Sequence, residues 1–211
     1  MRIETDIKLD FDDVLIRPKR STLTSRKDVD LYRSYNFLHG GSYFQGIPIM
    51  AANMDGVGEL EVGETLSSLD LFTCYKKNID EGSLIEALKL YTVNKQRDNV
   101  AVTIGRNDND FDKLGRISKH VIVKNICVDV ANGYSQAFVD FVSKIRDNYP
   151  SSNIFAGNVV TGEMVEELLL AGADVVKVGI GSGSVCTTRI KTGVGYPQFS
   201  CIAECADAAH G

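Results

Sequence analysis

The chain has 211 residues, of which 44% are hydrophobic and 24% charged, so it favours one folded domain and excludes a disordered chain. A formal net charge of −5 gives no electrostatic reason to expect nucleic-acid binding, although backbone N–H groups can still bind a small phosphorylated molecule. No apolar stretch reaches the roughly 18 residues of a membrane span and the N-terminus lacks a signal-peptide core, so we expect a cytoplasmic protein without membrane contact. The five scattered cysteines form no C-x-x-C pair, and we expect free thiols and no zinc site.

Short apolar runs alternate with amphipathic stretches along the chain. Runs that are rich in Val and Ile and apolar on both faces predict buried parallel strands at Ile47–Met54, Leu71–Tyr75, Val100–Gly105, Ile122–Ala131, Asn153–Val160 and Val175–Gly181. Apolar residues at three- and four-residue spacing predict helices at Glu59–Leu69, Ser83–Tyr91, Phe111–Lys119, Tyr134–Tyr149, Thr161–Ala171 and Phe199–Ala209. The stretch His39–Ser42 predicts a surface turn before the first strand. This alternation predicts a parallel α/β sheet, and the pattern alone leaves both a doubly wound sheet and a barrel open.

The most informative segment follows the last predicted strand and reads Val178-Gly-Ile-Gly-Ser-Gly-Ser-Val-Cys-Thr-Thr-Arg189. Its three glycines allow sharp turns and a close approach of the backbone to a ligand or cation. A cysteine in such a loop does not serve a core, so Cys186 is a candidate nucleophile if its thiolate is favoured. The alternative is a flexible linker with an inert thiol.

Polar clusters follow three other predicted strands. They are Ala52–Asp55, Tyr75–Asn78 and Cys127–Gly133. In a barrel these clusters would converge with the glycine-rich loop on one face, whereas in a doubly wound sheet they would spread along an edge. The alternative for the lysines is a solvated loop, and for Asn132 it is helix capping. There is no G-x-G-x-x-G opening a helix after the first strand and no Walker phosphate loop.

The segment Gly181-Ser-Gly-Ser-Val-Cys-Thr-Thr-Arg189 resembles the catalytic loop shared by IMP dehydrogenases and GMP reductases. Further segments resemble GMP reductases specifically, namely Leu9–Arg20, Asp129–Ser135, Ala156–Met164 and Lys191–Gln198. IMP dehydrogenases usually carry a regulatory insertion after the second helix, and the stretch from Glu81 to Val100 leaves no room for one. The resemblance covers the whole chain.

The resemblance implies a (β/α)8 TIM barrel, truncated here after about six βα units, with residues 1–211 forming a single incomplete domain. It implies NADPH-dependent reductive deamination of GMP to IMP with release of ammonia, through a covalent thioimidate. In the family, a segment resembling Ala206–Gly211 is followed by two more strands, a mobile flap and a glutamate that assists proton transfer. We therefore expect activity to need the missing C-terminal segment. The partner that the resemblance implies is a further copy of the chain in a homo-oligomer, as in the usually tetrameric family, or a complementing C-terminal chain. There are two alternatives to GMP reductase activity. The chain could belong to an IMP dehydrogenase, or it could be a catalytically silent remnant that only associates with a homologue.

The resemblance also implies roles for individual residues. Cys186 matches the nucleophile and Thr188 the proton donor and acceptor of the deamination step. Contacts to NADPH fall on Ser25, Arg26, Lys77, Asp129, Val130, Ala131, Ile180 and Gly181. Backbone carbonyls that match a potassium site fall on Gly181, Gly183, Cys186 and Arg189. The chain departs from the family pattern at Gly56, Lys76, Asn78, Ile104, Arg106 and Ser182. Ser182 stands where the family usually has proline, which predicts a looser turn. Lys76, Ile104 and Arg106 follow the second and third strands, close to the expected cofactor, which predicts altered cofactor affinity or selectivity.

Overall fold

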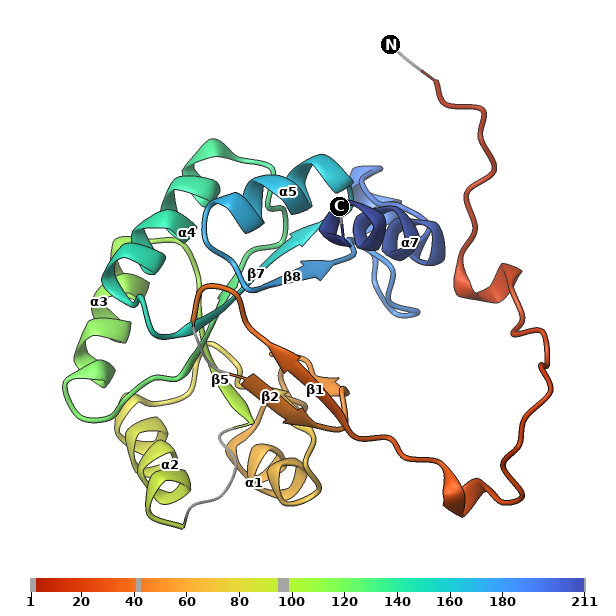
Figure 1. Cartoon of the computed structure of the whole chain (residues 1–211). Helices are drawn as coiled ribbons and strands as arrows, with labels where there is room; N and C mark the ends of the chain where they lie inside the picture. The colour runs from red at the N-terminus through yellow and green to blue at the C-terminus, as the bar shows by residue number, and fades with distance from the viewer. Residues whose placement is uncertain (1–2, 41–42, 95–98, 211) are drawn as a thin grey trace.

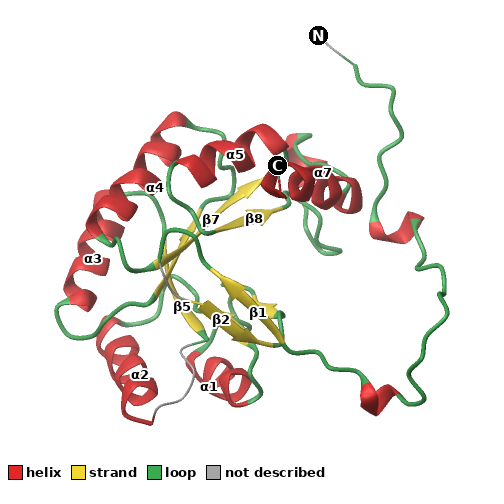
Figure 2. Cartoon of the chain, in the orientation of Figure 1, coloured by secondary structure: helices red, strands yellow, loops and turns green. Residues whose placement is uncertain are grey.

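A computed structural model describes residues 3–40, 43–94 and 99–210 of the chain. Its centre is a parallel sheet in which each strand pairs with the next one along the chain. The strands are β3 (Met50–Ala51), β4 (Phe72–Cys74), β5 (Val100–Ile104), β6 (Asn125–Asp129), β7 (Asn153–Val159) and β8 (Val175–Val178). Figure 1 shows this sheet curled into an open half-barrel with the helices on its outer side, and Figure 2 separates the two kinds of element by colour. The α/β class and the incomplete barrel that the resemblance implied are thus confirmed.

A helix follows each strand and returns the chain along the outside of the sheet. These helices are α1 (Leu60–Ser68), α2 (Glu81–Asn94), α3 (Asp108–Ser118), α4 (Gln136–Asn148), α5 (Gly162–Leu170) and α7 (Gln198–His210). The six predicted helices are all present, with ends that shift by a few residues. In α4 the residues at helical spacing, Phe138, Phe141, Val142 and Ile145, are buried as their spacing predicts. None of the helices within the described residues is long and apolar enough to cross a membrane.

Each strand contributes to two separate apolar clusters because successive side chains point to opposite faces. In β6, Ile126 and Val128 join the large cluster between sheet and helices, whereas Cys127 joins a smaller cluster inside the half-barrel. Phe72 and Phe155 meet in that inner cluster, with ring centroids 5.2 Å apart. Burial on both faces explains why these strands lack a polar/apolar alternation in the sequence.

The first predicted strand is much shorter than its apolar run. Of Ile47–Met54, only Met50–Ala51 pairs with β4. Pro48 interrupts the run because it has no N–H for the ladder, and Ile49 N instead donates to Ile47 O at 2.7 Å. The last predicted strand ends at Val178 because Gly179 adopts a φ of 128°.

An antiparallel hairpin that the sequence did not predict precedes the sheet. Its strands are β1 (Arg33–Asn36) and β2 (Tyr43–Gly46). The predicted turn falls between them; its first half, His39 and Gly40, is described, and its second half lies outside the described residues. β1 is exposed along its whole length, so it shows no apolar periodicity, but Phe44 of β2 packs edge-on against Phe72 of the inner cluster. The hairpin therefore covers one end of the half-barrel interior.

The buried carboxylate of Asp174 connects this hairpin to the sheet and to α4. One oxygen accepts hydrogen bonds from the backbone N–H groups of His39 and Gly40, at 2.8 and 3.2 Å. The other accepts from Arg146 Nη2 at 2.6 Å and from Ile154 N at 2.9 Å. Ion pairs taken out of water depend on such complete hydrogen bonding, because an unpaired buried charge is costly.

A single substitution tests the importance of this connection. We expect Asp174→Ala to lower the free energy of unfolding by about 3 kcal/mol, since it leaves the Arg146 guanidinium without its carboxylate and several N–H groups without an acceptor. Urea unfolding followed by circular dichroism measures the change. Asp147→Ala removes an exposed carboxylate from the same helix as Arg146 and should stay within about 0.5 kcal/mol of wild type. Equal effects of the two substitutions would contradict the assignment.

Candidate active site

Lys177 stands at the centre of the polar groups inside the half-barrel. Its Nζ donates to Asn53 Oδ1, just after β3, at 2.8 Å and forms a short ion pair with Asp129 at the end of β6. One side chain on β8 therefore joins groups from the opposite edge and from the middle of the sheet. Asn53 and Asp129 come from two of the polar clusters that the sequence singled out, but Lys177 was missed because it lies within an apolar strand.

Burial alone would disfavour the charged form of Lys177. The pKa of Lys177 is nevertheless raised, because its electrostatic interactions with Cys127 and Asp129 outweigh the burial. The ammonium stays protonated at neutral pH, so Asp129 faces a fixed positive charge. This arrangement makes the centre of the half-barrel mouth a preformed polar site above the apolar inner cluster.

Lys77, after β4, has a different partner. Its Nζ lies 2.9 Å from Asp110 Oδ2, at the start of α3, and Gly105 leaves the room for this pair because an added Cβ there would lie 2.7 Å from that ammonium. The neighbouring Lys76 is held by Glu59 at 2.7 Å. Ile104, one of the departures from the family pattern, points away from the mouth and is fully buried in the cluster between sheet and helices.

The glycine-rich loop after β8 is folded onto side chains of its own chain. Gly179 and Gly181 have φ values of 128° and 70°, which side chains other than glycine rarely adopt. A Cβ at Gly179 would lie 2.5 Å from Gln198 Oε1, and one at Gly181 would lie 2.8 Å from Arg189 Cγ. The glycines predicted a close approach of the backbone to a ligand or cation. In this structure the backbone at Gly179 and Gly181 closely approaches the side chains of Gln198 and Arg189 instead.

Cys186 lies exposed near the end of this loop, beside the hydroxyl of Thr188. Its Sγ lies 3.3 Å from Thr188 Oγ1, and its backbone N donates to Gly183 O at 2.9 Å. Thr188 begins α6 (Thr188–Thr192), a short helix that the sequence did not predict. The hydroxyl and backbone N–H of Thr188 stabilise the thiolate, and they lower the pKa of Cys186. By contrast, Cys201 and Cys205 are buried in α7, and burial raises the pKa of Cys201 to about 12.

The other residues that the resemblance assigns to cofactor contacts fall into two groups. The first group lies at the ends of β6 and β8. Asp129 ends β6, and the half-buried Val130 follows it and donates its backbone N–H to Gly157 O of β7 at 2.8 Å. Ala131 belongs to the loop after β6, and Ile180 and Gly181 belong to the loop after β8. Ser25 and Arg26 instead lie on the N-terminal arm, which we define as residues 3–32. Their side chains are exposed, and Figure 1 shows this part of the arm running outside the half-barrel. The structure therefore does not bring these two to the strand ends.

Four backbone carbonyls were expected to bind a potassium ion. Two pairs of these residues approach each other, since an added Cβ would lie 3.4 Å from Arg189 N at Gly181 and 3.6 Å from Cys186 Cβ at Gly183. The carbonyls of Gly183 and Arg189 each accept one backbone hydrogen bond, from Cys186 N and Gly193 N. A carbonyl oxygen has two lone pairs, so the carbonyls of Gly183 and Arg189 each keep one lone pair for a further contact.

Taken together, the mouth holds an exposed thiol with a lowered pKa, an adjacent hydroxyl and a half-buried group made of Lys177, Asp129 and Asn53. This set suits covalent attack on an electrophilic carbon followed by transfer at the same carbon. These groups lie on, or directly after, strands β3, β6 and β8, and parallel pairing places the carboxyl ends of those strands on one rim.

Comparison with known proteins agrees with this geometry. Residues 8–211 match the family described as IMP dehydrogenase / GMP reductase domain. Proteins named GMP reductase from Citrobacter koseri and from Enterobacter sp. are each 55% identical to the chain, and one from Shigella flexneri is 54% identical. Each alignment covers 100% of this chain and 61% of the relative, so the chain spans about 61% of the length of the proteins that it matches.

The contact between Cys186 and Thr188 makes a prediction about thiol reactivity. Thr188→Val removes the hydroxyl that stabilises the thiolate, so the pKa of Cys186 should rise and alkylation by iodoacetamide at neutral pH should slow. Alkylation rates between pH 6 and 10, measured by mass spectrometry of the Cys186 peptide, give the pKa directly. Thr188→Ser keeps the hydroxyl and serves as the matched control. An unchanged pH profile in Thr188→Val would show that the hydroxyl does not stabilise the thiolate.

Proposed function

We propose, because this chain belongs to the IMP dehydrogenase / GMP reductase family, that it carries the nucleophile-bearing part of a GMP reductase. The reaction is reductive deamination of GMP to IMP, with NADPH as reductant and ammonia as the second product. The observation that carries this proposal is the exposed Cys186 thiol, whose pKa is lowered by Thr188 in a loop directly after a barrel strand. In barrels the loops at this end of the strands form the active sites.

Cys186 is the proposed nucleophile. Its thiolate adds to C2 of the guanine ring, and the exocyclic amine leaves that carbon as ammonia, which gives a thioimidate linked to Sγ. This covalent step divides one difficult substitution into two easier ones. When the cofactor is bound, NADPH supplies the hydride that C2 then receives as the C–S bond breaks and IMP is released.

Thr188 is the proposed proton carrier of the first step. Its hydroxyl lies 3.3 Å from Cys186 Sγ, so it can accept the thiol proton and donate to the departing amine. A hydroxyl both donates and accepts hydrogen bonds, which suits a group that passes a proton on. The glutamate that completes this relay in the family is expected in a segment beyond the residues of this chain.

The cofactor is proposed to bind over the mouth of the half-barrel, against Lys77, Asp129, Val130, Ala131, Ile180 and Gly181. The fixed positive charge of Lys177 holds Asp129 in place for a hydroxyl donor of the ligand. Ser25 and Arg26 lie on the arm and are not assigned to this site; a role for them in cofactor binding requires the arm to reach another copy of the chain. A potassium ion at the carbonyls of Gly181, Gly183, Cys186 and Arg189 would stiffen the loop that carries the nucleophile.

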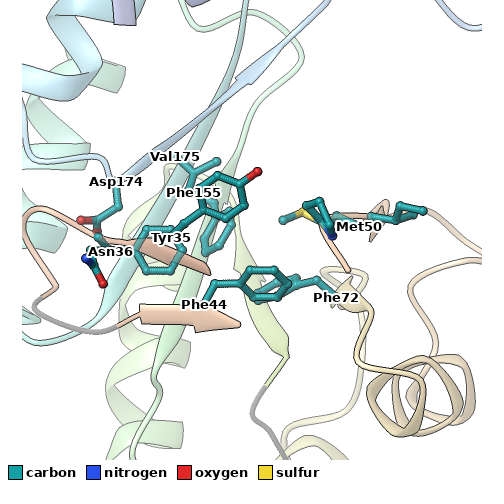
Figure 3. Close-up of a pocket in the computed structure, with 11 residues that line it drawn as sticks. Tyr35, Asn36, Phe44, Met50, Phe72, Phe155, Asp174 and Val175 are labelled. Carbon is teal, nitrogen blue, oxygen red and sulfur yellow. The ribbon is translucent and has the colours of Figure 1, made fainter. Parts of the chain in front are cut away.

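Activity is proposed to need a complementing segment. The described sheet leaves the outer edges of β3 and β8 without a strand partner, and unpaired edges promote pairing with another chain. An apolar hollow of about 370 Å³ lies between the hairpin and these edges. Tyr35, Phe44 and Phe72 are among its lining residues, and Figure 3 shows these side chains. In a closed barrel, further strands pair with both edges and cover such a surface. We propose that the remaining part of the enzyme, in one chain or two, occupies this place, and that the active form is a homo-oligomer.

The direction of the reaction separates this proposal from its alternatives. With the C-terminal remainder of a relative supplied as a second chain, we expect GMP-dependent consumption of NADPH together with stoichiometric ammonia and IMP. Cys186→Ala should abolish this turnover, and Cys201→Ala should retain it because that thiol is buried in α7. Absorbance at the NADPH band and chromatography of the nucleotides measure both.

Two other outcomes would point elsewhere. Reduction of NAD coupled to oxidation of IMP, with no consumption of NADPH when GMP is added, would identify an IMP dehydrogenase. Specific association with the second chain without turnover of either nucleotide would identify a catalytically silent partner.

A further inference from the structure

Residues 8–10 of the N-terminal arm are attached to α7, near the opposite end of the chain. Leu9 N donates to Ser200 Oγ at 2.8 Å, and Ser200 N donates back to Leu9 O at 3.1 Å. Lys8 Nζ pairs with Glu204 Oε1 at 2.7 Å, one turn further along α7. Two hydrogen bonds and an ion pair thus fix the direction of the arm where it passes α7, and Figure 1 shows the arm running past that helix.

Asp10 is the arm residue that reaches the glycine-rich loop. Its Oδ2 accepts from Arg189 Nη1 at 2.9 Å, and its Oδ1 accepts from Gln198 N at 3.1 Å. It is also the N-cap of the short helix η1 (Phe11–Asp13), where its side chain accepts from Phe11 N. The helix cap fixes the carboxylate, so both oxygens are already oriented toward Arg189 and Gln198.

Arg189 transmits this contact to the whole loop. Its stem lies against both Gly181 and Gly195, where an added Cβ would come within 2.8 and 2.6 Å of Arg189 Cγ. Its other terminal nitrogen donates to the carbonyl of Tyr196. One side chain therefore holds the beginning and the end of the segment 181–196 together, and Asp10 holds that side chain.

Cys186 lies inside the segment that is closed in this way. Arg189 directly follows Thr188, whose hydroxyl lies beside the Cys186 thiol, and both belong to the short helix α6. A five-residue helix has little stability of its own, so its position depends on the contacts that hold it. The ion pair between Asp10 and Arg189 is about one-third exposed on both sides, and such pairs contribute little to global stability. Its effect is expected in the loop rather than in the fold.

We propose that the arm segment Lys8–Asp13 is a clasp for the loop 181–196, and that Asp10 is the residue that positions Cys186 and Thr188 through Arg189. The proposal rests on the proposed function only in taking Cys186 as the nucleophile. It assigns a role in the site to a residue that lies 176 positions before that nucleophile in the chain.

The test compares Asp10→Asn with Asp12→Asn in the 211-residue chain. Both remove one negative charge from η1, but the side chain of Asp12 is exposed and points to no partner in the loop. We expect Asp10→Asn to speed amide hydrogen exchange at Lys191 and Gly193 by about tenfold, as loss of a charge-assisted hydrogen bond does for a local opening. The alkylation profile of Cys186 should move to higher pH, and the thermal midpoint should stay within about 4 °C of wild type. Asp12→Asn should leave all three unchanged.

A double-mutant cycle adds a second criterion. If Asp10 acts through Arg189, then Asp10→Ala together with Arg189→Ala should expose the loop no more than Arg189→Ala alone. Unchanged hydrogen exchange and alkylation in Asp10→Asn would overturn the clasp. A variant in which hydrogen exchange rises throughout the fold as much as in the loop would overturn it as well. No nucleotide is used in these measurements, so their outcome is independent of whether GMP forms an adduct with Cys186.

Discussion

Parallel pairing of the strands in chain order is the constraint on which the site depends. It sends every strand in the same direction, so the loops that leave the sheet emerge on one rim although they are far apart in sequence. Lys177 and Asn53 are 124 positions apart and meet at 2.8 Å for this reason. The alternation of side chains along each strand adds a second requirement, because residues next to Asp129 and Lys177 must fill the core between sheet and helices. The same short segments thus stabilise the fold and supply the polar groups at its mouth.

In the loop after β8, the glycines with positive φ determine the path of the backbone that leads to Cys186. Its left-handed residues create space for Gln198 and Arg189, and those side chains define the path on which Cys186 is carried. Exposure of Cys186 at the end of such a loop, with Thr188 beside it, gives a reactive thiol without burying a charge. The other four cysteines are buried, so Cys186 is the cysteine whose thiol solvent and small molecules can reach.

The sequence predicted the repeating parts of the fold well because each carries its own periodic signal. Strands buried on both faces read as continuous apolar runs, and α4 shows the helical spacing of its buried face. The hairpin lacked a signal because the side chains of β1 are exposed, and α6 was missed because one helical turn is too short for a period. The pattern alone also left barrel and doubly wound sheet undecided, since curvature arises from the sheet as a whole. The resemblance to a family supplied that step.

The site was predictable as a set of strand ends but not as a set of contacts. Cys186 and Asp129 stood out because they interrupt glycine-rich or apolar segments, and the structure places Asp129 at the end of β6 and Cys186 in the loop after β8. Lys177 was hidden within an apolar strand, and the bond between Asp10 and Arg189 spans 179 positions, so no local pattern could reveal either. Whether Ser25 and Arg26 contribute depends on the position of the arm, which local sequence does not encode.

The proposed reaction depends on a covalent bond between Cys186 and the purine. The most direct measurement is peptide mapping by mass spectrometry after the complemented protein has been incubated with GMP in the absence of NADPH. We expect the Cys186 peptide to gain the mass of GMP less ammonia. Subsequent addition of NADPH should remove this mass and yield IMP, and the Cys201 and Cys205 peptides should stay unmodified. Turnover of GMP by a Cys186→Ala variant, or an adduct on any other cysteine in its place, would contradict it.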